Sequence, residues 1–174
     1  MDRARIVGGA VLRDVQDDDL PVMLRWRNHP RVRAASFETH EIGEDEHARW
    51  WATARSDAGK LVLIYDHEGA AAGVVTYAGL PSGTARWGFY LDLDGLERSG
   101  ALLRAWIGLE RAAIEHAFGP LGLSVLRGEV LAGNEPVRRL HRRFGFEEIG
   151  VYQRIVDGVP RDVVVIQLNR KEEA

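Results

Sequence analysis

Two ionisable side chains, Glu129 and His141, have sequence surroundings that suit proton transfer. A carboxylate among apolar neighbours can act as a general base. An imidazole, which titrates near neutral pH, can act as a general acid. Each residue also has a purely structural interpretation. Glu129 would then be a surface charge paired with an arginine, and His141 would be a core histidine hydrogen-bonded to a backbone carbonyl.

A strand and the helix that follows it would position this pair. Residues 123–131 predict the strand, and Asn134 is a good N-cap for the helix because its side chain can accept from a free first-turn amide. Pro136 costs no hydrogen bond in that first turn. Gly145 ends the helix where a left-handed residue is favoured. One helix face carries residues spaced i, i+3, i+4 and i+7, namely Val137, Leu140, His141 and Phe144.

The remaining hydropathy pattern alternates between strands and helices. Strands are expected at 10–15, 60–65, 71–77, 84–92, 147–156 and 161–168, and helices at about 19–28, 31–35, 44–55 and 102–117. The acids of 17–19 are candidate N-caps, 94–100 is expected to be a loop, and Asp157-Gly158 predicts a tight hairpin turn. Hairpins in the middle of the chain, with helices between the later strands, predict an α/β (α+β) fold with a mixed sheet.

The composition excludes several classes of protein. The chain has 174 residues, a formal net charge of −3 and no cysteine, so we expect neither a nucleic-acid partner nor disulfides or a cysteine nucleophile. No apolar run is long enough to cross a membrane, and residues 1–9 lack the apolar core of a signal peptide. We therefore expect a cytoplasmic protein that does not bind membranes. His40, Glu41 and His47 lack the spacing of a metal site, so no metal is expected.

The segment 134–146 resembles the "N-x-x-A-x-x-L-Y-x-K-x-G-F" helix of the GCN5-related N-acetyltransferase (GNAT) family. The resemblance extends over residues 10–168, so the chain 1–174 is expected to be a single GNAT domain. It implies a mixed central sheet of about seven strands flanked by about four or five helices. It also implies that acetyl-CoA, as co-substrate, lies in a cleft where two parallel strands, 84–92 and 123–131, splay apart.

The resemblance further implies where acetyl-CoA would be held. Backbone amides of residues 90–92 would hold the thioester carbonyl and the pantetheine arm, and the loop 98–100 would present the pyrophosphate to a helix N-terminus. Arginines of the 134–144 helix would bind phosphates, although a solvated face is the simpler interpretation for most of them. The cofactor-binding candidates are Tyr90, Leu91, Asp92, Arg98, Ser99, Gly100, Asn134, Arg142 and Arg143.

Two departures from the family pattern affect the chemistry. Asp94 and Glu97 stand in the expected pyrophosphate loop, where they should repel the cofactor unless Arg98 offsets them. The family's tyrosine, usually the acid that reprotonates the leaving thiolate, is replaced by His141. An acid at the position of Glu129 serves related members as the base that deprotonates the attacking amine. Glu129 and His141 are therefore the catalytic candidates of a direct transfer without a covalent enzyme intermediate.

The segment 26–33, Trp-Arg-Asn-His-Pro-Arg-Val-Arg, resembles the subgroup that acetylates nucleotide-linked amino sugars, of the pseudaminic-acid pathway type. An aromatic ring can stack on a base or a sugar, and an arginine can pair with a diphosphate. The acceptor-binding candidates are Trp26, Arg27, Asn28, His29 and Arg33. The alternative is that Trp26 packs in the core and that His29-Pro30 only stops a helix.

Three functions are compatible with these residues. The favoured one is acetyl-CoA-dependent N-acetylation of a primary amine on a small molecule, most readily a nucleotide-linked amino sugar. The second is acetylation of a protein N-terminus, as in ribosomal-protein acetylases whose first helix looks similar. The third is a degenerate, non-catalytic binding module, which the unusual 94–99 segment motivates. A homodimer fits the family, although no stretch of sequence marks an interface.

Overall fold

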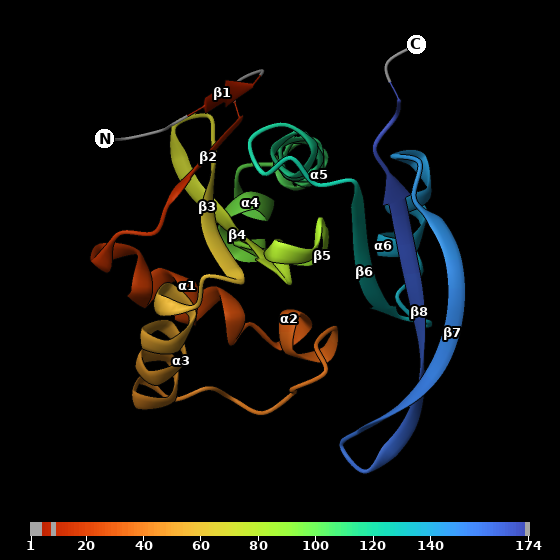
Figure 1. The fold of residues 1–174 in the computed structure, drawn as a ribbon. Coiled ribbons are helices and arrows are strands. Elements are labelled where there is room, and N and C mark those ends of the chain that lie inside the picture. Colours follow the sequence, from red (N-terminus) through yellow and green to blue (C-terminus); the bar gives the residue numbers. More distant parts are fainter. Residues whose placement is uncertain (1–4, 8–9, 173–174) are drawn as a thin grey trace.

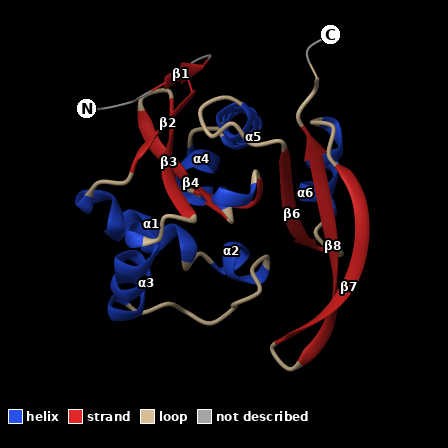
Figure 2. Cartoon of the chain, viewed as in Figure 1, coloured by secondary structure: helices blue, strands red, loops and turns tan. Residues whose placement is uncertain are grey.

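The computed structural model describes residues 5–7 and 10–172, which form one sheet with helices on both faces (Figures 1 and 2). The predicted α/β architecture is confirmed. In chain order the elements are β1 (Arg5–Val7), β2 (Ala10–Asp14), the 3-10 helix η1 (Asp17–Asp19), α1 (Leu20–Arg27), α2 (Pro30–Ala34), α3 (Glu44–Ser56), β3 (Lys60–His67), β4 (Ala70–Ala78), the 3-10 helix η2 (Leu80–Ser82), β5 (Thr84–Leu91), α4 (Leu93–Arg98), α5 (Leu102–Phe118), β6 (Val125–Leu131), α6 (Glu135–Arg143), β7 (Glu147–Val156) and β8 (Val159–Asn169).

The sheet has the strand order β1-β2-β3-β4-β5-β6-β8-β7. All neighbouring strands are antiparallel except β5 and β6, which are parallel. Besides the 3-10 helices η1 and η2, one strand and one α-helix were not predicted. Strand β1 has only three residues, too few to show a periodicity, and α4 occupies part of the segment 94–100 that was expected to be a loop. The mixed sheet expected from the sequence is therefore present with one more strand.

Helix α5 covers one face of the sheet. Its side chains Leu109 and Ala113 are fully buried in a core that also contains Tyr65 and Tyr77 of β3 and β4. The hydroxyl of Tyr77 donates a hydrogen bond to the carbonyl of Ala113 over 2.7 Å. Burial disfavours the charged phenolate and so raises the pKa of Tyr77. The longest helix is thus packed across β2, β3 and β4.

Helices α1 and α3 cover the opposite face. Met23 and Trp26 of α1 and Ala54 of α3 pack against Ile64 and Val74 of β3 and β4. Successive residues of a strand face opposite sides, so β3 contributes Ile64 to this core and the next residue to the core under α5. Strands buried on both faces explain the unbroken apolar run of this region of the sequence.

An ion pair joins β2 to the start of α1. Arg13 donates to both carboxylate oxygens of Asp19, at 2.8 and 2.9 Å, and its Nε donates to Asp66. Asp19 also accepts from the backbone amide of Gln16 over 2.7 Å. The guanidinium favours the ionised carboxyl and so lowers the pKa of Asp19. The acids at 17–19 therefore form a 3-10 turn whose N-cap is Gln16. Helix α1 begins only at Leu20, and Asp19 before it makes no side-chain capping hydrogen bond to that helix.

Tight turns with left-handed residues join β3 to β4 and β7 to β8. Asp157 and Gly158 have φ angles of 53° and 73°, so the predicted turn between β7 and β8 is confirmed. Glu68 and Gly69 turn between β3 and β4 with φ angles of 51° and 84°. Two successive positive φ angles give a turn whose twist matches that of the flanking strands. The C-terminal hairpin extends well beyond the rest of the sheet (Figure 1).

Strand β7 is the outer edge of the sheet, and every residue from Glu147 to Ile155 is exposed. Within residues 5–7 and 10–172, no helix is both long and apolar enough to span a membrane. The same described residues contain no group of three or more His, Cys, Asp or Glu side chains placed to hold a metal ion.

Candidate active site

A cleft of about 1100 Å³ opens where β5 and β6 part. The two strands pair at three positions only, residues 84–86 with residues 125–127. Beyond these positions β5 remains paired with β4, and β6 remains paired with β8. Residues 87–91 and 128–131 therefore line the cleft with main chain that has lost its parallel partner. The predicted splaying of these two parallel strands is confirmed.

Aromatic side chains pack together at the point where β5 and β6 part. The ring of Trp87 stacks at 5.5 Å on Phe89 and at 5.9 Å on Phe146. Trp87 also reaches across to β6, because a Cβ on Gly128 would stand only 3.4 Å from its indole nitrogen. Ring packing thus joins the two strands where their main chains no longer pair.

The backbone amides at the end of β5 divide into two sets. The amide of Asp92 donates to the carbonyl of Ala72 over 2.8 Å, so it faces β4. Because amides alternate along a strand, those of Leu91 and Phe89 face the open seam. The expectation that Tyr90 and Asp92 offer their amides to the cofactor is therefore wrong. The carboxylate of Asp92 instead accepts from the amide of Gly95 over 3.0 Å and caps α4.

His141 is 3% exposed and lies on the inner face of α6. Its Nδ1 is 2.6 Å from Oε1 of Glu110, a fully buried residue of α5. The structural interpretation of His141 had assumed a backbone carbonyl as its partner, so a carboxylate in that place is a new feature. Nε2, the other polar atom of the ring, has no recorded hydrogen bond to a described residue.

The surroundings of the His141–Glu110 pair are aromatic. The histidine ring meets Trp87 edge-on at 5.6 Å and Phe89 at 6.2 Å, and it lies 5.3 Å from Phe146. Oε2 of Glu110 is buried and has no hydrogen-bond partner within the described part of the chain. Water is thus largely excluded from the carboxylate, which strengthens its interaction with the histidine. His141 itself lines the cleft.

Glu129 also lines the cleft, from the other face of β6. Leu126, Gly128 and Val130 are buried towards α5, so the alternation of the strand turns Glu129 towards the face that carries α1, α2 and α3. Its side chain is half-buried and has no hydrogen bond or ion pair to any described residue. The arginine partner assumed by its structural interpretation is absent from that described region. The cleft therefore has an imidazole on one face of the sheet and a carboxylate on the other.

The two acids of α4 that were expected to repel the cofactor both have polar partners. Asp94 lies 3.1 Å from Nε2 of His29, and Glu97 forms an ion pair with Arg31 at 2.8 Å. His29 precedes α2 and Arg31 lies in its first turn, so two polar contacts join α4 to the start of α2. The Asp94–Ser99 segment therefore presents paired carboxylates at this end of the cleft.

The turn after α4 leads directly to the N-terminus of α5. Gly100 has a φ of 67°, and the hydroxyl of Ser99 donates to Leu96 over 3.1 Å. Leu102 begins α5 and lines the cleft. The first amides of a helix lack intrahelical acceptors, so this terminus offers free donors at the cleft. Arg98 does not line the main cleft; it borders a smaller cavity of about 190 Å³.

The five acceptor candidates hold the chain after α1 and do not line the cleft. Trp26 is 4% exposed in the core, as its structural interpretation had it. Asn28 brackets Ile42, donating to its carbonyl and accepting from its amide, both over 2.8 Å. Arg27 donates to the carbonyl of Glu38, and Arg33 donates to the carbonyl of Thr39. His29 accepts from the amide of Arg31.

The acceptor wall consists instead of the neighbouring α2 and the residues after it. Arg31, Val32 and residues 34–37 line the cleft from this side, and Arg161 and Asp162 of β8 line it from the hairpin. The five predicted residues thus support a wall that their neighbours form. Helix α2 has only five residues, too few for a hydropathy pattern to show which side faces a cavity.

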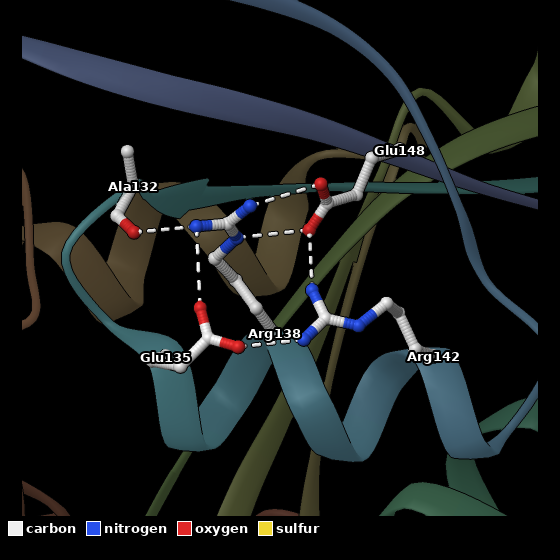
Figure 3. A network of polar contacts seen from close by, with 5 residues as sticks. All are labelled: Ala132, Glu135, Arg138, Arg142 and Glu148. Atoms are coloured by element: carbon white, nitrogen blue, oxygen red, sulfur yellow. Dashed lines mark hydrogen bonds and ion pairs between the residues drawn. The ribbon is translucent and has the colours of Figure 1, made fainter.

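Among the remaining candidates, Tyr90 and Asn134 line the cleft and the arginines of α6 do not. Burial raises the pKa of the Tyr90 hydroxyl. Asn134 is the residue before α6, but its side chain makes no capping hydrogen bond, so that part of the prediction is wrong. Arg142 pairs with Glu135 and Glu148 on the outer face, as Figure 3 shows.

The sequence interpretation missed Glu110. The signal was present, because Glu110 follows Trp106 by four residues and precedes Ala113 by three, which places it on the apolar face of α5. A carboxylate on a buried face requires a partner. The partner, His141, lies 31 positions further along the chain.

Residues 10–147 match the family model described as "Acetyltransferase (GNAT) domain". The chain belongs to the GNAT acetyltransferase family. It is an acetyl-CoA-dependent N-acetyltransferase of the GNAT type, and its acceptor is not fixed by the match. No curated protein matches the sequence at a significant level.

Solved structures show the same GNAT fold at low sequence identity. A spermidine N-acetyltransferase from Vibrio cholerae, in complex with CoA and spermine, is 18% identical, with a TM-score of 0.77 over 94% of this chain and 96% of the other. An N-acetyltransferase from Staphylococcus aureus Mu50 is 20% identical, with a TM-score of 0.70 over 92% and 98%. The Campylobacter jejuni N-acetyltransferase PseH is 16% identical, with a TM-score of 0.67 over 94% and 99%.

Proposed function

We propose that this enzyme acetylates the primary amine of a nucleotide-linked amino sugar, with Glu129 as general base and His141 as general acid. The observation that carries the proposal is that one cleft, through the seam between β5 and β6, is lined by both residues. This cleft has Glu129 on the face of α1–α3 and His141 on the face of α5 and α6. Acetyl-CoA supplies a thioester that an uncharged amine can attack. The two residues then stand on opposite sides of the reacting carbon.

The open main chain of β5 fits the cofactor's arm. The amides of Phe89 and Leu91 face the seam without a strand partner, and the carbonyl and amides of a pantetheine chain would complete their hydrogen bonds. The N-terminus of α5, next to Leu102, would hold the pyrophosphate. The ion pair of Glu97 with Arg31 and the contact of Asp94 with His29 would lower the repulsion that these acids would otherwise cause.

The acceptor wall carries both signs of charge: Arg31 is already paired with Glu97, and Arg161 stands beside Asp162. Arg31 and Arg161 line the cleft, and the guanidinium of Arg161 has no ion-pair partner among the described residues. Guanidinium groups pair well with a diphosphate and repel a polycation. Phe37 adds an aromatic ring to the same wall, with the guanidinium of Arg154 at 4.4 Å from its centre. A nucleoside-diphosphate sugar would meet this wall through the unpaired guanidinium of Arg161 and the ring of Phe37.

Glu129 would take the proton from the attacking amine, directly or through water. Its side chain has no hydrogen bond or ion pair to a described residue, and it lies on the acceptor side of the cleft. Substituting Glu129→Gln keeps the shape and removes the base, so kcat should fall about 100-fold or more, with a small change in KM. Glu147→Gln, an exposed carboxylate at the start of β7, is the matched control.

The proposal is tested by measuring release of free thiol from acetyl-CoA with a panel of amines. The panel contains nucleotide-linked amino sugars, free amino sugars, polyamines and a peptide with a free N-terminus. We expect the highest kcat/KM with a nucleotide-linked amino sugar. A preference for the peptide would support the protein N-terminal alternative, and a preference for polyamines would overturn the charge argument. Absence of both thiol release and acetyl-CoA binding by calorimetry would indicate a binding module.

A further inference from the structure

Glu110 has no part in the function proposed above, yet its position is costly. Its side chain has no solvent exposure, and it sits in the middle of α5 among apolar residues. An ionised carboxylate in such a place is tolerated only with a close partner. The partner is His141, at 2.6 Å, and the second carboxylate oxygen has no donor in the described structure. A buried acid whose only recorded contact is a cleft histidine points to a role in what that histidine does.

We propose that Glu110 is a positioning residue that holds His141 with Nδ1–H turned into the protein and Nε2 turned to the cleft, and that its negative charge stabilises the protonated imidazole. This inference rests on the proposed role of His141 as general acid. It adds a residue on α5 to the catalytic arrangement and assigns the ring nitrogen that delivers the proton.

The geometry supports the orientation. An ionised carboxylate accepts but does not donate, so with Glu110 ionised the 2.6 Å contact requires the hydrogen on Nδ1. Trp87 and Phe89 meet the ring edge-on and restrict its rotation. Nε2 has no partner among the described residues, while His141 lines the cleft. The hydrogen bond made by one ring nitrogen sets the role of the other.

The charge balance supports the stabilisation. With a neutral histidine the buried pair carries one net negative charge, and with an imidazolium it carries none. A neutral ion pair costs less to bury than a single charge. The other ionisable groups of the cleft lie on α2, β5, β6 and β8, and none has a recorded contact with His141; they are Arg31, Tyr90, Glu129, Arg161 and Asp162.

The proton transfer balances without any further reactant. His141 gives the proton on Nε2 to the sulfur of the departing coenzyme, so one N–H bond breaks and one S–H bond forms. The ring becomes neutral and keeps its Nδ1 hydrogen bonded to Glu110, which remains ionised throughout. Solvent reaching Nε2 through the cleft restores the proton before the next turnover. Glu110 thus acts through the histidine and never touches the reacting atoms.

The test compares Glu110→Gln with Glu115→Gln, which removes an exposed carboxylate from the same helix. We expect Glu110→Gln to lower kcat about 10- to 100-fold and to leave KM for acetyl-CoA within about twofold. A general acid must be protonated, so losing the stabilising charge should move the alkaline limb of the kcat profile to lower pH. Glu115→Gln should change neither quantity.

A double-mutant cycle separates positioning from a general structural role. If Glu110 acts through His141, adding Glu110→Gln to His141→Gln should lower kcat no further. Additive losses in kcat, or an unchanged kcat and pH limb in Glu110→Gln, would overturn the inference. Circular dichroism and unfolding curves verify that the variants fold.

An NMR measurement on the unmodified enzyme tests the orientation without any variant or turnover. Nitrogen-15 spectra of histidine distinguish Nδ1–H from Nε2–H, and we expect the His141 Nδ1 to carry a proton in a strong hydrogen bond. An unprotonated Nδ1 would overturn the inference even if the Glu110 variant does not fold. Failure of the unmodified enzyme to release thiol with any amine would instead overturn the proposed function. Turnover that survives Glu110→Gln overturns only this inference.

Discussion

Helix α6 carries ion pairs on both of its faces, and the two sets differ in their access to water. On the inner face, the side chains of His141 and Glu110 are 4% and 0% exposed. On the outer face, Arg138 and Arg142 share Glu135 and Glu148 with side-chain exposures between 21% and 46% (Figure 3). The outer face has four recorded ion pairs and the inner face has one.

The larger number of ion pairs on the outer face does not mean that this face contributes more to stability. An exposed pair exchanges hydrogen bonds with water for hydrogen bonds with its partner, so its net contribution is small. The arginines do lower the pKa values of Glu148 and Glu135, which shows that the pairs interact. Glu110 has no water to return to, so removing its partner leaves a bare charge in the core. The stability that a pair contributes therefore depends on whether water can take the place of a lost partner.

The largest expected effect is that of His141→Ala on stability. The substitution leaves Glu110 buried without its partner, and breaking such a pair costs about 3–5 kcal/mol of unfolding free energy. Urea unfolding curves measure the loss. A loss no larger than that of an exposed substitution would show that water reaches Glu110, and the contrast between the two faces would fail.

A second variant shows whether the buried pair contributes stability or only function. Replacing both residues, as in Glu110→Leu with His141→Leu, removes both charges and fills a similar volume with apolar atoms. Such replacements are often neutral or stabilising. We expect stability to recover relative to His141→Ala while turnover stays low. Recovery of turnover would contradict the catalytic role of the pair.

The fold was predictable because its signals are local. The alternation in 84–92, the Asp157-Gly158 turn and the Gly145 helix end each depend on residues within a few positions, and each is found in the structure. The misses are also local in origin. Helix α4 was read as a loop because Gly95 and Gly100 suggested one, although the carboxylate of Asp92 caps its first turn.

The site was only partly predictable because its partners are distant in sequence. Glu129 and His141 stood out by residue type and both line the cleft, but their roles remain predictions. The Glu110–His141 contact joins two helices, and no periodicity reports which face meets which. Trp26 to His29 looked like a binding surface because polar and aromatic types are common to surfaces and to loop supports.

A smaller effect is expected from Arg138→Ala on the outer face. Arg138 makes two hydrogen bonds to Glu148 and one to the carbonyl of Ala132, all replaceable by water. The loss of unfolding free energy should stay below about 1 kcal/mol and shrink further in high salt. Arg143→Ala is the matched control, since Arg143 has no recorded ion pair. It also tests whether Arg143 binds the cofactor, which would raise KM for acetyl-CoA.

The smallest effect is the response of the outer face to acid. Hydrogen bonding from Arg138 holds the pKa of Glu148 below its ordinary 4.5, so the folded state binds this proton less readily than the unfolded state. The contribution is complete above pH 4.5 and is lost as the pH falls below that value. Amide exchange in β7 should therefore accelerate between about pH 4.5 and 3, after correction for intrinsic rates, and Glu148→Gln should remove most of this dependence. The same acceleration in both proteins would show that the acid response of β7 comes from other carboxylates, such as Asp19, and that the outer pairs do not fasten α6 to this strand.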